Sequence, residues 1–178
     1  LSFEKLWYKI AVIAICQNRV ISGDVLQMFL QEGPKDTLVT AIRNNLLPFA
    51  IQSGNADVLS VLIDHFPGAL SEMFGPSSEI PLHSCCHIHP QLLSLLINKG
   101  IVHDVGGESD VGGLFVENIH GDSPFDMLVQ SLLTSDARGK GYRSVAWKRI
   151  EVCLQYISVV RRTNIKKDPR QILDPSGI

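Results

Sequence analysis

SEIPLHSCCHIHPQLLSLLINKG runs from Ser78 to Gly100 and carries the pattern of two consecutive short helices. Pro81 suits the first position of the first helix, where no amide donor is needed, and Pro90 opens the second helix in the same way. One face of the first helix gathers three residues: Leu82, Cys85 and Cys86. Gly100 follows the last apolar positions, and we expect it to end the second helix as a left-handed C-terminal cap.

Apolar residues recur outward from this stretch at intervals of 33 and 34 residues. The recurring pairs are Val25-Leu26, Val58-Leu59 and Leu92-Leu93, followed by Phe29-Leu30, Leu62-Ile63 and Leu96-Ile97, and the blocks close at Gly33, Phe66 and Gly100. A period of this length is typical of a repeat architecture, in which each unit buries its apolar face against its neighbours. We therefore expect Val25, Val58 and Leu92 to occupy equivalent core positions.

The block from Asn45 to Phe66 contains the same two segments, divided at Gly54-Asn55. The side chain of Asn55 suits the N-cap of the second segment, and Asp57 places a negative charge in its first turn. Each helix is too short to be stable alone in water. Neighbouring units must therefore stabilise them.

These residues resemble the ankyrin repeat, whose pattern is T-P-L-H-x-A-A, a glycine turn, V-V-x-x-L-L and a closing glycine. The resemblance is carried by Ile80-Pro81-Leu82-His83, by Cys85-Cys86 at the small positions, and by Leu92 to Gly100. The stretch from Gly121 to Asp126 is similar to the start of another repeat, with Ser123 as N-cap, Pro124 as first helical residue and Asp126 as capping partner. The resemblance implies that His83 hydrogen-bonds to the backbone and braces adjoining turns.

The expected fold is all-α: a short ankyrin-type solenoid of about four helix pairs with finger-like loops. Its units lie near residues 1–33, 34–66, 78–104 and 118–158, within one domain spanning 1–160. The segment 134–141 is polar and glycine-rich and is predicted as an inserted loop. Beyond it, apolar residues at helical spacing predict a long last helix: Ala146, Ile150, Cys153, Leu154 and Ile157. HEAT or armadillo repeats are the structural alternative, but their period of about 40–47 residues fits less well.

Charge divides the chain of 178 residues into an acidic body and a basic end. Residues 161–178 are expected to form a basic, flexible tail, since Asp168-Pro169 and Asp174-Pro175 favour irregular structure. The longest aliphatic run, Ile10 to Cys16, is far shorter than a membrane helix of about 20 residues. The four cysteines form neither a disulfide framework nor a C-x-x-C pair, which favours an intracellular protein of the cytoplasm or nucleus.

His83, Cys86 and His87 also suggest a metal site, because His83 and His87 share a helix face and zinc accepts nitrogen and sulfur ligands. The repeat pattern gives the cysteines and His83 structural positions instead. The sequence contains no Walker motif, nucleophile elbow or H-E-x-x-H motif. We therefore expect no enzyme, no cofactor and no small-molecule substrate.

The expected function is protein–protein interaction, as a scaffold or adaptor, through the fingers and first helices that ankyrin-like proteins present to partners. The fingers are expected around residues 72–78 and 114–120, with Met73, Phe74, Phe115 and His120 as candidate contacts. Alternatively, each finger folds its apolar residue onto its own repeat. The structural motif comprises Pro81, Leu82, His83, Gly100, Gly121, Ser123 and Pro124.

Two other functions remain open. The basic C-terminal region suits a nucleic acid or an acidic partner, although Arg161 to Arg170 contains no interleaved aromatic residue for base stacking. The chain also fits a regulatory repeat segment of a larger enzyme, because it begins at Leu1 and not at a methionine.

Overall fold

A computed structural model describes residues 3–33, 38–86, 90–107, 110–134 and 140–167. These residues form an all-α structure without a β-strand. The helices are α1 (Phe3–Gln17), α2 (Gly23–Glu32), α3 (Leu38–Ser53), α4 (Ala56–His65), the 3-10 helix η1 (Pro67–Leu70), α5 (Pro81–Cys85), α6 (Pro90–Val102), α7 (Pro124–Thr134) and α8 (Lys140–Lys167). None of these described helices carries an apolar stretch long enough to cross a membrane.

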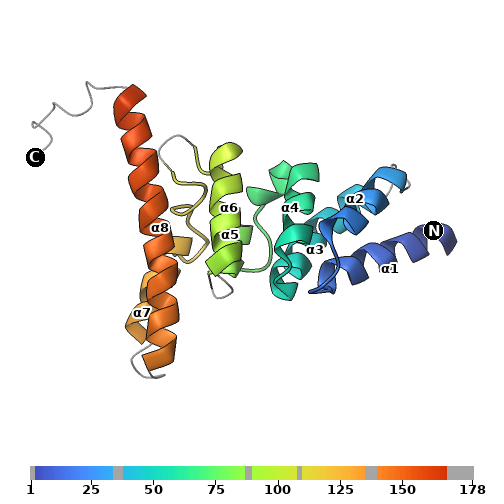
Figure 1. Cartoon of the computed structure of the whole chain (residues 1–178), viewed down its shortest axis with the longest axis horizontal. Coiled ribbons are helices and arrows are strands. Elements are labelled where there is room, and N and C mark those ends of the chain that lie inside the picture. Colours follow the sequence, from blue (N-terminus) through green and yellow to red (C-terminus); the bar gives the residue numbers. More distant parts are fainter. Residues whose placement is uncertain (1–2, 34–37, 87–89, 108–109, 135–139, 168–178) are drawn as a thin grey trace, which may run out of the picture.

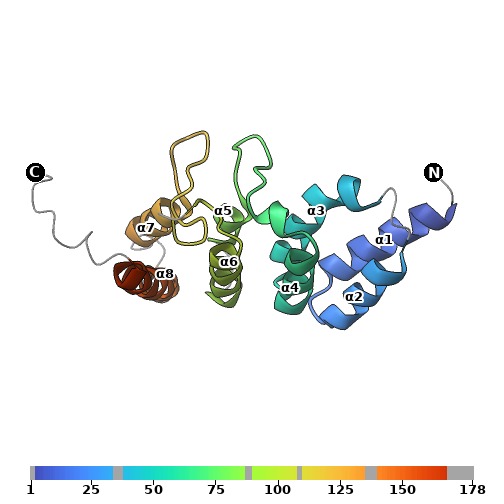
Figure 2. The ribbon, with the colours of Figure 1, turned by 90° about the horizontal axis from the view of Figure 1, so that it is seen from above.

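The helices stack as pairs into an elongated molecule of two layers (Figures 1 and 2). Odd-numbered helices pack in sequence against one another, α1 on α3, α3 on α5 and α5 on α7. Even-numbered helices do the same, α2 on α4, α4 on α6 and α6 on α8. The ranges 1–33, 34–66 and 78–104 therefore each contain one helix from each layer, and 118–158 contains α7 and the larger part of α8.

The apolar pairs form the core between neighbouring units, with one exception in the first pair. Leu26, Leu59 and Leu93 are the equivalent positions that are fully buried. Val58 and Leu92 are buried as expected, but Val25 is 38% exposed, so its prediction as a core residue is wrong. The reason is its place in the stack: α2 belongs to the first pair and packs on α4 along one side only.

A buried Asn55 joins the first two units. Its side-chain oxygen accepts from the N–H of Val58 at 3.2 Å and so caps α4, as expected. Its side-chain nitrogen donates to the carbonyls of Asn18 at 2.9 Å and Ile21 at 2.7 Å, in the loop between α1 and α2. Gly54, with φ of 76°, supplies the tight turn before it.

The prediction that Gly100 ends a helix in the left-handed conformation is wrong. Gly100 lies inside α6, and the left-handed residue is Asp104, with φ of 54°. The N–H of Val105 donates to the carbonyl of Gly100 at 2.9 Å, which closes the helix in a Schellman arrangement. Gly100 is needed for another reason, because a Cβ there would lie 2.3 Å from the backbone oxygen of Gly112.

Two helices extend beyond their expected limits. Helix α3 begins at Leu38 and contains Pro48 in its interior. Helix α8 continues to Lys167, so residues 161–167 are helical where a flexible tail was expected, and 168–178 lie outside the described residues. Arginine and lysine favour helix, and positive charge near a helix C-terminus is stabilising.

The expected loop at 134–141 is shorter at both ends. Thr134 is the last residue of α7, and α8 already begins at Lys140. The intervening residues 135–139 lie outside the described part of the chain. Within α8, which forms where the apolar spacing predicts a long last helix, Ala146, Ile150 and Cys153 are buried, whereas Leu154 is exposed.

Candidate functional site

The first finger, residues 71–80, is a narrow hairpin between η1 and α5. Phe74 and Glu79 exchange two backbone hydrogen bonds of 2.9 and 3.1 Å in an isolated antiparallel bridge. Gly75, with φ of 71°, and Ser78, with φ of 50°, turn the chain at the tip. The hairpin stands out from one long edge of the stack, where Figure 2 shows it in green.

The second finger lies between α6 and α7 and comprises the described residues 103–107 and 110–123. Asn118 organises its far end: its side-chain oxygen accepts from the N–H groups of His120 at 2.9 Å and Asp122 at 3.1 Å. Asp110 organises its base by accepting from the N–H groups of Val111 and Phe115. Burial raises the pKa of Asp110, while the backbone N–H groups that surround the carboxylate act in the opposite direction.

The two fingers project from the same edge and are joined by backbone (Figure 2). The N–H of Ile119 in the second finger donates to the carbonyl of Ser77 in the first at 3.2 Å. Leu114, fully buried, anchors the second finger, and its carbonyl accepts from the N–H of Phe125 at 3.1 Å. Residues of two successive units therefore share one surface.

Three large apolar side chains on the fingers face solvent. Met73 is 56% exposed and Ile119 62% exposed. Phe115 is 44% exposed, but its ring also packs on Phe125 in α7, with centroids 5.7 Å apart. Phe115 therefore packs in part against α7, whereas Met73 and Ile119 are the more exposed side chains of the fingers.

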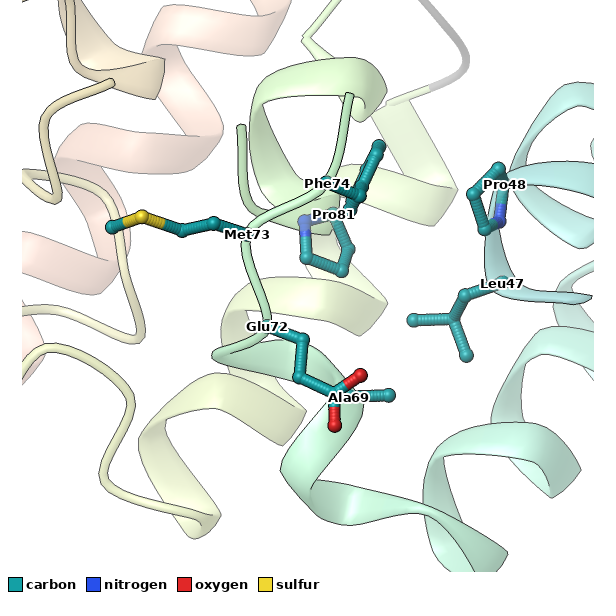
Figure 3. A pocket seen from close by; sticks show the side chains of 7 residues that line it. All are labelled: Leu47, Pro48, Ala69, Glu72, Met73, Phe74 and Pro81. Atoms are coloured by element: carbon teal, nitrogen blue, oxygen red, sulfur yellow. The ribbon is translucent and has the colours of Figure 1, made fainter. Parts of the chain in front are cut away.

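Phe74 is half-buried and lines a shallow depression at the base of the first finger. The depression is bounded by α3, η1, the finger and the start of α5, through Leu47, Pro48, Ala69, Glu72, Met73, Phe74 and Pro81. In Figure 3 the side chain of Met73 extends away from the other lining residues, toward the loops drawn in yellow and gold. Phe74 thus forms part of the wall of this depression, whereas the side chain of Met73 belongs to the exposed surface of the finger.

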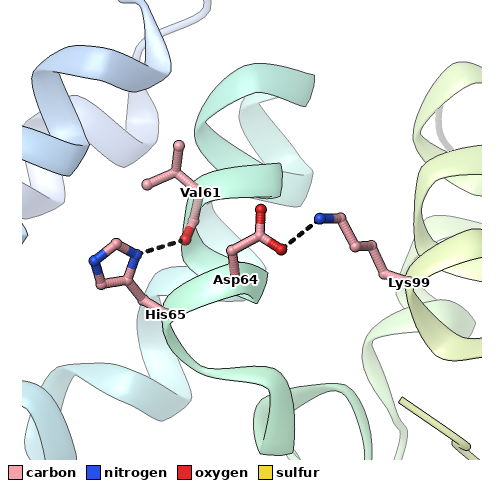
Figure 4. Close-up of polar contacts among 4 residues, drawn as sticks. All are labelled: Val61, Asp64, His65 and Lys99. Carbon is pink, nitrogen blue, oxygen red and sulfur yellow. Dashed lines mark hydrogen bonds and ion pairs between the residues drawn. The ribbon is translucent and has the colours of Figure 1, made fainter. Parts of the chain in front are cut away.

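Acidic side chains surround the fingers. Glu72, Glu79, Glu117 and Asp122 lie on them, and His120 is exposed near the end of the second finger. Between residues 44 and 137 the only lysine or arginine is Lys99. Its ammonium pairs with Asp64 between α6 and α4, in the even-numbered layer (Figure 4). The finger surface therefore combines exposed apolar groups with negative charge.

His83 spans two units below the fingers, and this is the bracing that was predicted. Its Nδ1 accepts from the N–H of Ile80 at 3.2 Å, which leaves Nε2 protonated to donate to the carbonyl of Asp122 at 3.0 Å. The ring is fully buried. The other motif residues support it: Pro81 opens α5, Leu82 is buried, and Gly121, with φ of 76°, turns the chain into α7.

The start of α7 carries the predicted capping arrangement. The hydroxyl of Ser123 accepts from the N–H of Asp126 at 3.2 Å and donates to its carboxylate at 2.6 Å. The same carboxylate accepts from the N–H of Ser123 at 3.1 Å. Pro124 is the first helical residue. Together these bonds satisfy orphan donors at the helix terminus.

Both ring nitrogens of His83 are engaged with backbone, so the imidazole has no lone pair for a metal ion. The single S–H of Cys86 has two carbonyl acceptors within reach, Leu82 at 3.3 Å and Pro124 at 3.2 Å, and burial raises the pKa of the thiol well above its usual range. Zinc binds thiolate, which this environment disfavours. Among the described residues no three His, Cys, Asp or Glu side chains are grouped to hold a metal; His87 and His89 lie outside them.

Sequence reasoning located the fingers but missed Ile119 and the contact with Ser77. The exposed isoleucine in a polar turn, just before His120-Gly121, was the available signal for Ile119. The hydrogen bond between the fingers could not be predicted from residue types, because it joins two backbone groups. Comparison with protein-family models, curated proteins and solved structures finds no match to the chain.

Proposed function

We propose that this chain is an ankyrin-type protein-recognition module, a scaffold or adaptor that binds a protein partner on its finger surface. The observation that carries the proposal is the joined pair of fingers, which exposes Met73 and Ile119 from one edge of the stack. Exposed apolar side chains on a braced surface are typical anchors of protein interfaces.

The repeat spacing of 33 and 34 residues and the order of helix packing support the ankyrin-type assignment. In such stacks a preformed surface lowers the entropy lost on binding. The Ile119–Ser77 hydrogen bond and the bracing by His83 supply this preorganisation here. The four buried free thiols support a reducing, intracellular location.

The test compares partner capture by the wild-type chain and by the double variant Met73→Ser/Ile119→Ser, quantified by mass spectrometry. The matched control is Val20→Ser, at an exposed valine between α1 and α2. We expect the double variant to lose at least one captured protein that the control retains. Its free energy of unfolding, measured by thermal denaturation, should stay within about 0.5 kcal/mol of the wild-type value. Identical captured sets for all three proteins would contradict the proposal.

A further inference from the structure

The outer face of α8 is a second surface, distinct from the fingers, that no other described helix covers. Helix α8 closes the C-terminal end of the stack and packs inward on α6 and α7 (Figure 1). Its inward face buries Ala146, Ile150 and Cys153. Beside this buried stripe, at the border of the exposed face, Trp147 is 55% and Leu154 47% exposed. They are seven residues apart, which places them on the same side of the helix two turns from each other.

The charge of α8 is opposite to that of the rest of the chain. Its 28 residues include eight lysines and arginines and one carboxylate, Glu151. The described residues before it, 3–134, contain five basic and twelve acidic residues. Because the body is acidic, the positive charge of α8 is concentrated at one end of the molecule.

The basic residues of α8 form two groups with an apolar interval between them. Among the basic residues whose side chains the structure describes, the first group is Arg143 and Lys148 and the second is Arg162, whereas the partly buried guanidinium of Arg149 lies toward Cys85 and Cys86. No basic residue lies between positions 150 and 160. The centre of the first group lies about 25 Å from Arg162 along the helix, from its rise per residue.

We propose that the outer face of α8 binds an acidic segment of a protein partner, whose apolar side chains pack on Trp147 and Leu154 while its carboxylates meet the two basic groups. Tryptophan is prominent among residues that dominate interface energies. Flanking charges of complementary sign speed the encounter and fix the register. This site is independent of the proposed finger surface.

The same pattern disfavours a polynucleotide as the occupant. A nucleic acid carries phosphates at even spacing and gains affinity from each phosphate neutralised by a cation. The middle of α8 offers instead Glu151, the exposed Leu154 and the exposed Val159. A peptide segment with apolar residues in its middle and acidic residues at its ends complements both the apolar and the basic residues of this face.

The test is a selection of random peptides displayed on phage against the whole chain at low salt. Bound phage are divided by whether they also bind the double variant Lys148→Glu/Arg162→Glu. Peptides that require the wild-type α8 should be rich in Asp and Glu on either side of Leu, Phe or Trp. Peptides that bind the finger surface bind both proteins and are lost with Met73→Ser/Ile119→Ser, so the two surfaces are read separately.

One selected peptide is then synthesised, and its affinity is measured by fluorescence anisotropy. We expect each single reversal, Lys148→Glu or Arg162→Glu, to weaken binding about five- to tenfold and Leu154→Ser by a similar factor. Lys9→Glu in α1, at the opposite end of the stack, makes the same charge change and should leave affinity unaltered. All four substitutions should preserve the circular dichroism melt.

Three results would overturn the proposal. The first is the absence of acidic enrichment among the α8-dependent peptides. The second is an unchanged affinity in Leu154→Ser, which would remove the apolar half of the site. The third is a duplex DNA oligonucleotide that displaces the peptide and binds more tightly, with a steep dependence on salt, which would assign the face to nucleic acid.

Discussion

Single buried side chains connect the backbones of adjacent helix pairs. Asn55 holds the loop of the first pair against the second, and His83 holds Ile80 of the third pair to Asp122 at the start of the fourth. In each case the side chain satisfies backbone groups that are far apart in sequence. Buried backbone groups are costly to leave without partners, so these two residues stabilise junctions and not only their own helices.

We predict that His83→Leu lowers the free energy of unfolding by about 2 kcal/mol, because the N–H of Ile80 and the carbonyl of Asp122 lose their partner. Urea titration measures the effect. His65→Leu is the control, since the exposed His65 bonds only to Val61 one turn earlier in its own helix (Figure 4). Equal losses for the two variants would show that His83 does not brace the junction.

We predict that Gly100→Ala also destabilises the protein, by about 2 kcal/mol, although alanine favours helix more than glycine does. The added Cβ would lie 2.3 Å from the backbone oxygen of Gly112, and backbone cannot move aside as a flexible side chain can. The matched control is Gly141→Ala in α8, where nothing lies within 4 Å of the new Cβ. Urea midpoints should fall for the first variant and stay level or rise for the second; a rise in both would refute the close contact.

At the scale of elements, each helix depends on its terminus and on its neighbour. Helix α4 is capped by Asn55 and α7 by Ser123 with Asp126. The caps differ in one respect: Asn55 also reaches the preceding unit through its amide nitrogen, whereas the Ser123 bonds remain within α7. Substitution can therefore separate helix capping from the connection between units.

We predict that Asn55→Asp costs about 1–2 kcal/mol even though aspartate is an equally good N-cap. Aspartate keeps the acceptor for the N–H of Val58 but cannot donate to the carbonyls of Asn18 and Ile21. Ser123→Ala, which removes a cap alone, should cost about 1 kcal/mol. Hydrogen exchange should locate the added loss of Asn55→Asp in the α1–α2 loop; a loss confined to α4 would contradict the account.

Elements whose signals are local were predictable, and those set by distant contacts were not. The caps at Asn55 and Ser123 and the starts of α5 and α6 at prolines follow from nearby residues. Gly100 was misplaced because its role depends on Gly112, in a loop twelve residues further on. Val25 was assigned to the core because a repeat pattern cannot show which unit lies at the end of the stack.

The finger surface also has features that could be predicted from local sequence and features that depend on distant contacts. The finger positions follow from where the chain departs from its period, so Met73 and Phe115 were found. How much of each side chain faces solvent depends on three-dimensional packing: the ring of Phe115 contacts Phe125 and is 44% exposed, whereas Met73 is 56% exposed. The sequence predicted a flexible tail for 161–178 because of its prolines, and so did not predict that α8 continues through residues 161–167.

For the molecule as a whole, the buried thiols make stability depend on pH. Burial raises the pKa of Cys16, Cys85 and Cys153 from an ordinary value of 9.0 to about 12. Above pH 9 the unfolded chain therefore ionises thiols that the folded chain keeps protonated. Their stabilising contribution is complete below pH 9 and is lost as the pH rises from 9 toward 12.

We predict that the free energy of unfolding falls between pH 9 and 11 by up to about 1.4 kcal/mol per pH unit for each of these thiols. Urea titrations across this range measure the slope. Cys16→Ala should reduce the slope by one thiol's share, which separates the effect from titrating lysines and tyrosines. An unchanged slope in that variant would contradict the assignment.

We propose that the joined fingers are the surface on which a protein partner docks. The most direct test places the photo-crosslinking residue p-benzoylphenylalanine at position 73, at position 119 or, as control, at position 20, and identifies the adducts formed in cells. The account predicts the same partner at positions 73 and 119 and its absence at position 20. A partner that crosslinks equally at all three positions, or at position 20 alone, would contradict it.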